Sequence, residues 1–274
     1  TWTGGMGMTF SLAAFDPATG QLGVAVQSKA FAVGAIVPWA LPGVGAVATQ
    51  ANANRHYGPG ALALLKEGLA PTQVIERLTA ADEGRKIRQL GVVDARGRAA
   101  NYTGENCLEW AGGLTGEGWT CQGNVLEGAG VVEAMAEAYL KTEGSFAERM
   151  LAALAAGQEA GGDRRGMQSA SLLVVGDNPN DPAGRILDLR VDDHHTPIEE
   201  LHRLYLVNQK LTEAFTGDWT DYAGNVVLIT EQLMQRRSIP GLQGLAEALG
   251  VPNGIRGRKI SKAFREAIER ERAK

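Results

Sequence analysis

Cysteine, long apolar runs and an excess of basic residues are scarce or missing in this sequence of 274 residues. The two cysteines, Cys107 and Cys121, are too few for a disulfide framework and form no C-x-x-C pair, so we expect neither structural disulfides nor a zinc site. No apolar run approaches the ~18–20 residues that a membrane-spanning helix needs, so we expect no association with a membrane. The net charge of −4 gives no general attraction to nucleic acid, which is therefore not an expected partner.

Motifs for targeting and for phosphate binding are also absent from the sequence. The first eight residues, TWTGGMGM, contain no basic segment followed by an apolar stretch, so we expect no signal peptide and a location in the reducing cytoplasm. The glycines at 4, 5, 43 and 45 lack the lysine and the spacing of a phosphate-binding loop. We therefore expect no cofactor.

Glycine is abundant, with 36 residues and no collagen-like period, which indicates many tight turns or close backbone approaches. Hydrophobic residues make up 44% and charged residues 21%, both near the average of globular proteins. The length fits one large domain, or one domain with an appendage.

The hydrophobic pattern predicts a mixed α+β protein. Strands are expected at 9–16 and 21–28 around a turn at 17–20, and two short strands interrupted by Pro38 and Pro42 follow. The later pattern predicts a helix over 59–79, a hairpin over 90–104, a strand at 119–124, helices near 128–141 and 145–157, and strands at 169–176 and 185–193. The helices are grouped between hairpins, and this order favours a layered fold in which helices cover sheets that are mainly antiparallel.

After Pro197 the pattern changes to an amphipathic helix, and the remainder is expected to be helical with breaks at 240–241 and 252–254. We therefore divide the chain into an N-terminal extension at 1–8, a main domain at 9–196 and a small helical C-terminal region at 197–274. Residues 255–274 contain eight Lys or Arg and three Glu, a net charge of +5. This segment is either a solvated terminal helix or a basic arm that contacts an acidic partner.

The opening segment, TFSLAAFDPATGQLGVAVQSKAF at 9–31, resembles the first hairpin of N-terminal-nucleophile hydrolases, including proteasome β subunits. Its extension to residue 50, together with QGN at 122–124 and GGDRRGMQSA at 161–170, is similar to a bacterial family called domain of unknown function 1028. Members of that family are described as having the N-terminal-nucleophile hydrolase fold, and many carry a C-terminal segment assigned to peptidoglycan binding. The resemblance implies a four-layer αββα sandwich of two antiparallel sheets.

In this class of hydrolases a Thr, Ser or Cys at the start of the first strand is the nucleophile, and its own α-amino group is the general base. A hydroxyl needs such a base, and an α-amine with a reference pKa of about 7.7–8.0 can accept a proton near neutral pH. The resemblance assigns the nucleophile to Thr9, which follows Met8. Residues 1–8 leave Thr9 without a free amine, so they are an extension, a propeptide removed by self-cleavage, or native residues of a protein without this chemistry.

The residues expected around Thr9 come from the ends of neighbouring strands. Proteasome subunits have an acidic residue where Gln27 stands and a lysine on the third strand; both are missing, so Lys29 is either a substitute or a solvated charge. The backbone N–H near Ala51 and the Asn52 side chain are expected to bind the oxyanion. The predicted catalytic set is Thr9, Ser11, Lys29, Asn52, Asp163 and Ser169, and the predicted substrate-binding set is Gln27, Ser28, Gln50, Asn54, His56, Tyr57, Asn124, Arg165 and Gln168.

Three hypotheses about function follow. The first is hydrolysis of a C–N amide bond in a small molecule by Thr9 through an acyl-enzyme, in a homo-oligomer such as a dimer. The second is a non-catalytic binding module of the same fold, which takes a small ligand or a cell-wall fragment. The third is metal-assisted hydrolysis at the Asp192–His195 cluster, although alternation along a strand allows only every second residue of it to cooperate. No resident metal is included in the first two hypotheses.

Overall fold

The computed structural model describes residues 9–216, 219–221, 225–256 and 259–272. The predicted extension at 1–8 lies outside the described residues. The chain divides between Leu204 and Tyr205 into two compact units, which are described separately below. The expectation of an α+β protein with antiparallel sheets is confirmed.

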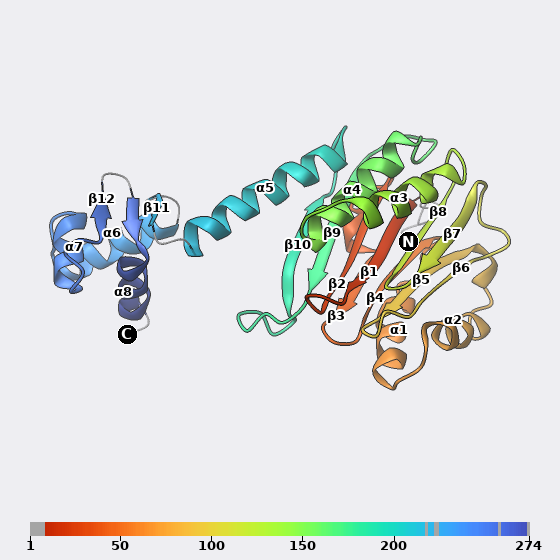
Figure 1. The fold of residues 1–274 in the computed structure, drawn as a ribbon, viewed down its shortest axis with the longest axis horizontal. Helices are drawn as coiled ribbons and strands as arrows, with labels where there is room; N and C mark the ends of the chain where they lie inside the picture. Colours follow the sequence, from red (N-terminus) through yellow and green to blue (C-terminus); the bar gives the residue numbers. More distant parts are fainter. Residues whose placement is uncertain (1–8, 217–218, 222–224, 257–258, 273–274) are drawn as a thin grey trace, which may run out of the picture. The chain divides into compact units, whose positions relative to one another are not determined.

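A six-stranded antiparallel sheet forms the centre of the first unit, with β1 and β2 in the middle (Figure 1). Its strand order is β10 (Arg185–Val191), β9 (Ser169–Val175), β2 (Gln21–Ser28), β1 (Thr9–Asp16), β8 (Trp119–Asn124) and β7 (Ala111–Gly116). The β1–β2 hairpin is the one predicted from the turn at 17–20. Strand β7 was not predicted, because its sequence AGGLTG contains three glycines and no apolar alternation.

A second, four-stranded antiparallel sheet has the order β3 (Pro38–Leu41), β4 (Gly45–Ala51), β5 (Arg88–Asp94) and β6 (Ala99–Thr103). Alternate residues of its strands point to opposite faces, as the period of two requires. Ala46 and Ala48 of β4 join Leu22, Val24 and Val26 of β2 in one buried cluster between the two sheets. The apolar core between the sheets therefore fixes how β2 and β4 lie against each other.

Helices cover the other face of each sheet. Helices α3 (Gly130–Lys141) and α4 (Phe146–Glu159) pack on the six-stranded sheet, and α1 (Tyr57–Lys66) and α2 (Pro71–Ala80) pack on the four-stranded sheet (Figure 1). The prediction of one helix over 59–79 was wrong: the chain leaves the helix at Gly68, with φ 97°, and Pro71 begins the next one. Short 3₁₀ helices span Val33–Ala35 and Arg85–Ile87.

Helix α5 (Pro197–Thr216) begins in the first unit, and the second unit contains its end together with α6 (Asn225–Arg237), α7 (Leu242–Ala248) and α8 (Lys262–Arg272). Beside these helices, β11 (Trp219–Asp221), β13 (Lys259–Ser261) and β12 (Ile255–Arg256) form a small antiparallel sheet that was not predicted. These strands are two or three residues long, which is too short for a periodic pattern to reveal.

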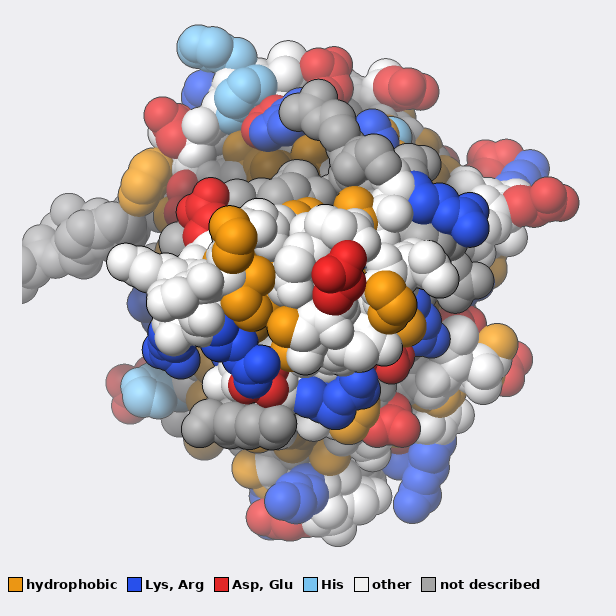
Figure 2. All heavy atoms as spheres, turned by 90° about the vertical axis from the view of Figure 1, so that its left-hand side faces the viewer, with side chains coloured by type: hydrophobic (Ala, Val, Ile, Leu, Met, Phe, Trp, Pro, Cys, Tyr) orange, Lys and Arg blue, Asp and Glu red, His pale blue; other side chains and the backbone are white. Residues whose placement is uncertain are grey.

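The glutamates at the basic end of the sequence form ion pairs, which leave the net charge of +5 of residues 255–274 unchanged. The three glutamates of α8 pair with arginines, Glu266 with Arg270, Glu269 with Arg272, and Glu271 with Arg237. Phe264 and Ile268 of the same helix are buried in the core of this unit. On the face drawn in Figure 2, basic and acidic side chains are interspersed. A contact of this segment with an acidic partner stays a prediction.

In the described part of the chain, no helix combines the length and the apolar character needed to cross a membrane.

Gly91 of β5 offers a test of the packing between the sheets. A Cβ atom at this position would overlap the carboxamide of Gln122 on β8, which is itself buried and hydrogen-bonded. We expect Gly91→Ala to lower the free energy of unfolding by about 1–3 kcal/mol, measured by urea denaturation. Gly130→Ala, at an exposed position where a Cβ meets nothing, is the control and should leave stability unchanged or slightly raised; equal effects of the two would contradict this account.

Candidate active site

Thr9 is the first residue of β1, a central strand with neighbours on both sides. It lies opposite Ser28, the last residue of β2, and opposite Asn124, the last residue of β8. Only 2% of Thr9 is exposed, and its Oγ1 donates a hydrogen bond to Ser28 Oγ at 3.1 Å. The hydroxyl that the family resemblance assigned as nucleophile is therefore buried where the ends of three strands meet.

Four buried carboxamides, from Gln50, Gln89, Gln122 and Asn124, connect the two sheets beside Thr9; we call them the amide network. The Gln50 Nε2 donates to the Thr9 carbonyl at 3.2 Å and to Gln89 Oε1 at 2.8 Å. Asn124 Nδ2 donates to the same Gln89 oxygen at 2.9 Å. Asn124 Nδ2 also lies 3.5 Å from the Thr9 carbonyl oxygen, so side chains of both sheets contact this carbonyl.

Ser11 extends the amide network along β1. Its Oγ donates to Gln50 Oε1 at 2.6 Å and accepts from Gln122 Nε2 at 2.6 Å. Thr120 Oγ1 donates to Gln122 Oε1 at 2.8 Å, so the oxygen of the Gln122 carboxamide also has a hydrogen-bond partner. Ser11 lies two residues after Thr9 and is therefore on the same face of β1, as predicted. Its hydroxyl, however, is hydrogen-bonded to Gln50 and Gln122.

Three residues at this end of the two sheets have left-handed backbone conformations that residues other than glycine rarely adopt. Ala51 ends β4 with φ 62°, Val125 follows β8 with φ 53°, and Ala32 lies after β2 with φ 53°. Each such residue costs of order 1–3 kcal/mol unless its surroundings compensate, and such residues concentrate at functional sites. The strain here lies where three chain segments turn away near Thr9.

Asp163 lies in the loop after α4, next to the end of β2. Its carboxylate is fully buried and accepts hydrogen bonds from the backbone N–H groups of Lys29, at 3.0 Å, and Arg165, at 2.9 Å. The Arg165 guanidinium pairs with it at 3.1 Å. The structure thus joins the predicted residues Asp163 and Arg165 to each other and to the end of β2.

The ammonium group of Lys29 points elsewhere, since its Nζ donates to the carbonyl of Met167 at 3.1 Å in an exposed position. Ser169 Oγ donates to the Ala30 carbonyl at 2.5 Å and accepts from the Val33 N–H at 3.0 Å, which orders the loop after β2. Gln27 is buried, with its Nε2 3.5 Å from the Gly166 carbonyl and no partner recorded for Oε1 among the described residues.

A second cluster surrounds Asp82, at the same end of the four-stranded sheet as Gln50 and Gln89. Asp82 Oδ2 accepts hydrogen bonds from Arg88 Nε at 2.9 Å, Tyr57 Oη at 2.9 Å and Asn54 Nδ2 at 3.2 Å. Arg88 Nη1 in turn donates to the backbone oxygen and to the side-chain oxygen of Asn52, at 2.6 and 2.9 Å. Three predicted residues, Asn52, Asn54 and Tyr57, therefore meet in one cluster.

Hydrogen bonding sets the protonation states in this cluster. Burial alone would raise the pKa of Asp82, but hydrogen bonds from Arg88, Asn54, the Gly84 N–H and Tyr57 outweigh it and hold the pKa well below its usual range. Burial, followed by the hydrogen bond to Asp82, raises the pKa of the Tyr57 hydroxyl. Near neutral pH the cluster is therefore an ion pair of Asp82 and Arg88 with Tyr57 as a neutral donor.

The other predicted residues lie further out. His56 is exposed, and its N–H donates to Asn54 Oδ1 at 3.1 Å just before α1. Gln168 Nε2 donates to Asp193 Oδ1 at 3.1 Å, and His194 Nδ1 accepts from the Thr196 N–H at 3.1 Å. Within the described ranges, no three His, Cys, Asp or Glu side chains are grouped so that they could hold a metal ion.

Sequence reasoning missed Gln89, Gln122, Arg88 and Asp82. One pattern could have revealed the first two: Gln27, Gln50, Gln89 and Gln122 each stand within three residues of one end of a strand. Buried carboxamides need hydrogen-bond partners, so repeated glutamines of this kind favour a shared polar layer. Asp82 and Arg88 give no such pattern, because they lie around a short 3₁₀ helix whose course depends on α2 and β5.

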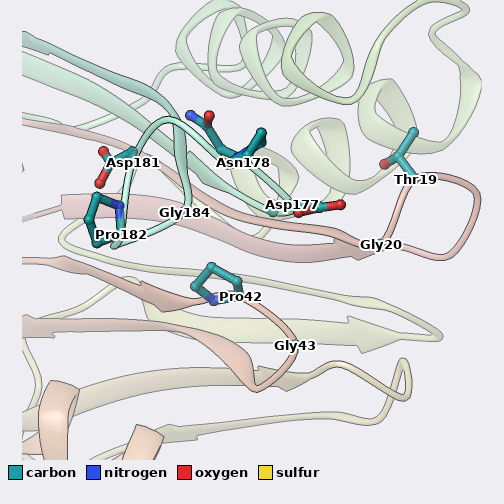
Figure 3. A pocket seen from close by; sticks show the side chains of 11 residues that line it. Thr19, Gly20, Pro42, Gly43, Asp177, Asn178, Asp181, Pro182 and Gly184 are labelled. Carbon is teal, nitrogen blue, oxygen red and sulfur yellow. The ribbon is translucent and has the colours of Figure 1, made fainter.

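A hollow of about 610 Å³ lies at the other end of β1 from Thr9. Figure 3 shows Thr19 and Gly20 from the β1–β2 turn, Pro42 and Gly43 from the β3–β4 turn, and the loop after β9 with Asp177 and Pro182 around it. It contains none of the residues predicted for the site.

Comparisons with known proteins agree on a family. A sequence profile of a family of unknown function, DUF1028, matches residues 9–201. A crystal structure of a Silicibacter pomeroyi protein with the same family assignment is 32% identical, with a TM-score of 0.68 over 80% of this chain and 92% of that chain. Anbu, an ancestral beta-subunit from Yersinia bercovieri, aligns at 10% identity over 76% of this chain and 97% of that chain, and its TM-score of 0.34 supports no conclusion. No curated protein matches the chain.

The low pKa of Asp82 predicts a specific dependence of stability on pH. A carboxylate whose pKa is depressed by folding stabilises the protein above its unfolded pKa of about 3.9, and this contribution is lost as the pH falls toward the folded pKa. Asp82→Asn should therefore be less stable than the wild type at pH 7, and the difference should shrink as the pH falls below 4. Urea denaturation between pH 7 and pH 2.5 measures it. Asp177→Asn, which replaces an exposed acid, is the control. A stability difference between Asp82→Asn and the wild type that grows as the pH falls would contradict the predicted direction.

Proposed function

This chain belongs to the DUF1028 family, and on that premise we propose that it is an amide hydrolase in which Thr9 is the N-terminal nucleophile. The observation that carries the proposal is the position of the Thr9 hydroxyl. It is buried at the start of a central strand and donates a hydrogen bond to Ser28 of β2, while side chains of β4 and β8 contact the carbonyl oxygen of the same residue. The proposed substrate is a small molecule with a C–N amide bond.

The arrangement of layers supports the proposal. Each sheet has a helix pair on one face, and buried apolar residues of β2 and β4 lie between the sheets. We assign this arrangement to the four-layer αββα sandwich of N-terminal-nucleophile hydrolases. Fold alone is a weak argument for function, so the assignment depends on the residues around Thr9.

The proposed reaction needs a free α-amino group on Thr9, and hence cleavage of the peptide bond after Met8. The neutral amine accepts the proton of Thr9 Oγ1 as this oxygen adds to the amide carbon of the substrate. The proton then passes to the leaving nitrogen, the C–N bond breaks, and an ester joins the acyl group to Thr9. Water, deprotonated by the same amine, hydrolyses the ester and releases the acid.

The negative charge that develops on the substrate oxygen needs hydrogen-bond donors. We propose that the backbone around Ala51 and the side chain of Asn52 supply them, because both lie directly after Gln50, whose amide contacts the Thr9 carbonyl. Asp163 lies between Lys29, after β2, and Leu126, after β8, and the Arg165 paired with it would orient the polar part of the substrate.

One observation favours a second candidate, a binding module without chemistry. The Lys29 ammonium group, the candidate substitute for the missing activating lysine, donates to the Met167 carbonyl. In that case the site, or the C-terminal unit, would bind a small ligand or a cell-wall fragment. The two candidates differ in whether Thr9 is required for turnover.

Substitution of Thr9 tests the nucleophile. Wild-type protein should hydrolyse at least one member of a panel of small amides, and Thr9→Ala should lower kcat by roughly 10³-fold or more. Thr9→Ser keeps the hydroxyl and should keep measurable turnover. Thr115→Ala, the same change at an exposed position on β7, is the matched control and should be fully active. Turnover by Thr9→Ala at the wild-type rate would refute the nucleophile, and ligand binding without any turnover would favour the binding module.

The chemistry also predicts where the active chain begins. Intact-mass measurement and N-terminal sequencing of active protein should give a chain that starts at Thr9, because a peptide nitrogen cannot serve as the base. Protein that retains residues 1–8 should be inactive toward the same amides. Full activity in a sample in which every molecule retains those residues would rule out this mechanism.

A further inference from the structure

Arg88 binds Asn52 by both of its oxygen atoms. Arg88 Nη1 donates to the backbone oxygen at 2.6 Å and to the side-chain Oδ1 at 2.9 Å. A guanidinium group has donors and no acceptor, so it can bond only the oxygen end of a carboxamide. This contact therefore fixes which way the Asn52 amide is turned, and leaves Nδ2 for another partner.

Arg88 is itself held rigidly. Its Nε donates to Asp82 Oδ2 at 2.9 Å, and the two side chains are only 17% and 14% exposed. Tyr57 and Asn54 donate to the same carboxylate oxygen, and the Gly84 N–H donates to the other one at 2.8 Å. A partly buried, charge-assisted pair with this many bonds has much less freedom than a surface arginine.

The position of this contact relates it to Thr9. Gln50 pairs with Gln89 and Ala51 pairs with Arg88, so the Arg88–Asn52 contact is the next step along the strands after the amide network. Gln50 Nε2 reaches the Thr9 carbonyl at 3.2 Å, and Ala51, with φ 62°, turns the chain between Gln50 and Asn52. In the part of the chain that the structure describes, no acceptor is recorded for Asn52 Nδ2.

We propose that Arg88 is a positioning residue that holds the Asn52 Nδ2–H donor toward the carbonyl oxygen of a bound amide substrate. This inference rests on the proposed function. The donor is aligned before the reaction, so it stabilises the charge that develops as Thr9 adds to the carbonyl without reorganising at that moment. Asp82 and Tyr57 act one step further away, by holding Arg88.

A double-mutant cycle tests the inference with an amide that the wild-type protein hydrolyses. Asn52→Ala and Arg88→Gln should each lower kcat by about 10²–10³-fold, the loss typical of one oxyanion donor, and should change KM little. Because Arg88 acts through Asn52, the double variant should be no slower than the slower single variant, within a few-fold. Arg88→Lys retains the charge beside Asp82 and should give an intermediate kcat.

The matched control is Arg98→Gln. Arg98 pairs with the buried Asp94 at the other end of β5, with Nε and Oδ2 2.6 Å apart. Arg98→Gln should lower the urea concentration at the midpoint of unfolding without lowering kcat. If Arg88→Gln does not fold, the cycle is run with Arg88→Lys and the same criterion applies.

The outcomes separate the two proposals. Two results would overturn the positioning role and leave the proposed function intact. One is a double variant in which the two losses in kcat multiply. The other is a loss of kcat in Arg88→Gln that is explained entirely by a lower urea midpoint of unfolding. Wild-type turnover that survives Thr9→Ala, or no turnover of any amide, would overturn the proposed function and the positioning role that rests on it.

Discussion

Buried carboxamides between the two sheets constrain the rest of this structure. A buried amide left without partners costs about 1–3 kcal/mol, so each of the four must find donors and acceptors inside the protein. Gln50 and Gln89 come from one sheet and Gln122 and Asn124 from the other, and their bonds cross between them. Directional hydrogen bonds therefore specify how the two sheets lie against each other at this end. The apolar core at the other end constrains mainly the volume that its side chains fill.

The close approach of the sheets depends on small residues. Gly91 leaves the space that the Gln122 carboxamide fills, and Gly113 leaves space for Asn101 and β8. The unusual glycine content thus has a local explanation where polar side chains must fit between backbones. The left-handed residues Ala32, Ala51 and Val125 add strain at the same end, and the amide network and the Asp82 cluster are the rigid surroundings that can maintain it.

The site combines two kinds of polar group with different physical roles. The amide network is neutral, and its carboxamide groups do not titrate. The Asp82 cluster is ionic: the lowered pKa of Asp82 keeps the carboxylate charged, and the charge holds Arg88 against Asn52. The neutral network holds the Thr9 carbonyl, and the ionic cluster holds Asn52, two residues after Gln50, so both restrict the backbone at this end of the sheets.

The sequence by itself determined the local structure of the first unit. Alternation predicted β1, β2 and the later hairpins, and turn residues placed the connections, because these features depend on neighbours a few positions apart. It did not determine the break between α1 and α2, the glycine-rich β7 or the short strands of the C-terminal unit, whose patterns are weak or interrupted. Only the tertiary structure decided which polar residues meet. Gln89 reaches Asn124 and Arg88 reaches Asn52 across more than thirty positions of sequence, and such contacts follow from sheet register and layer packing, which no local pattern contains.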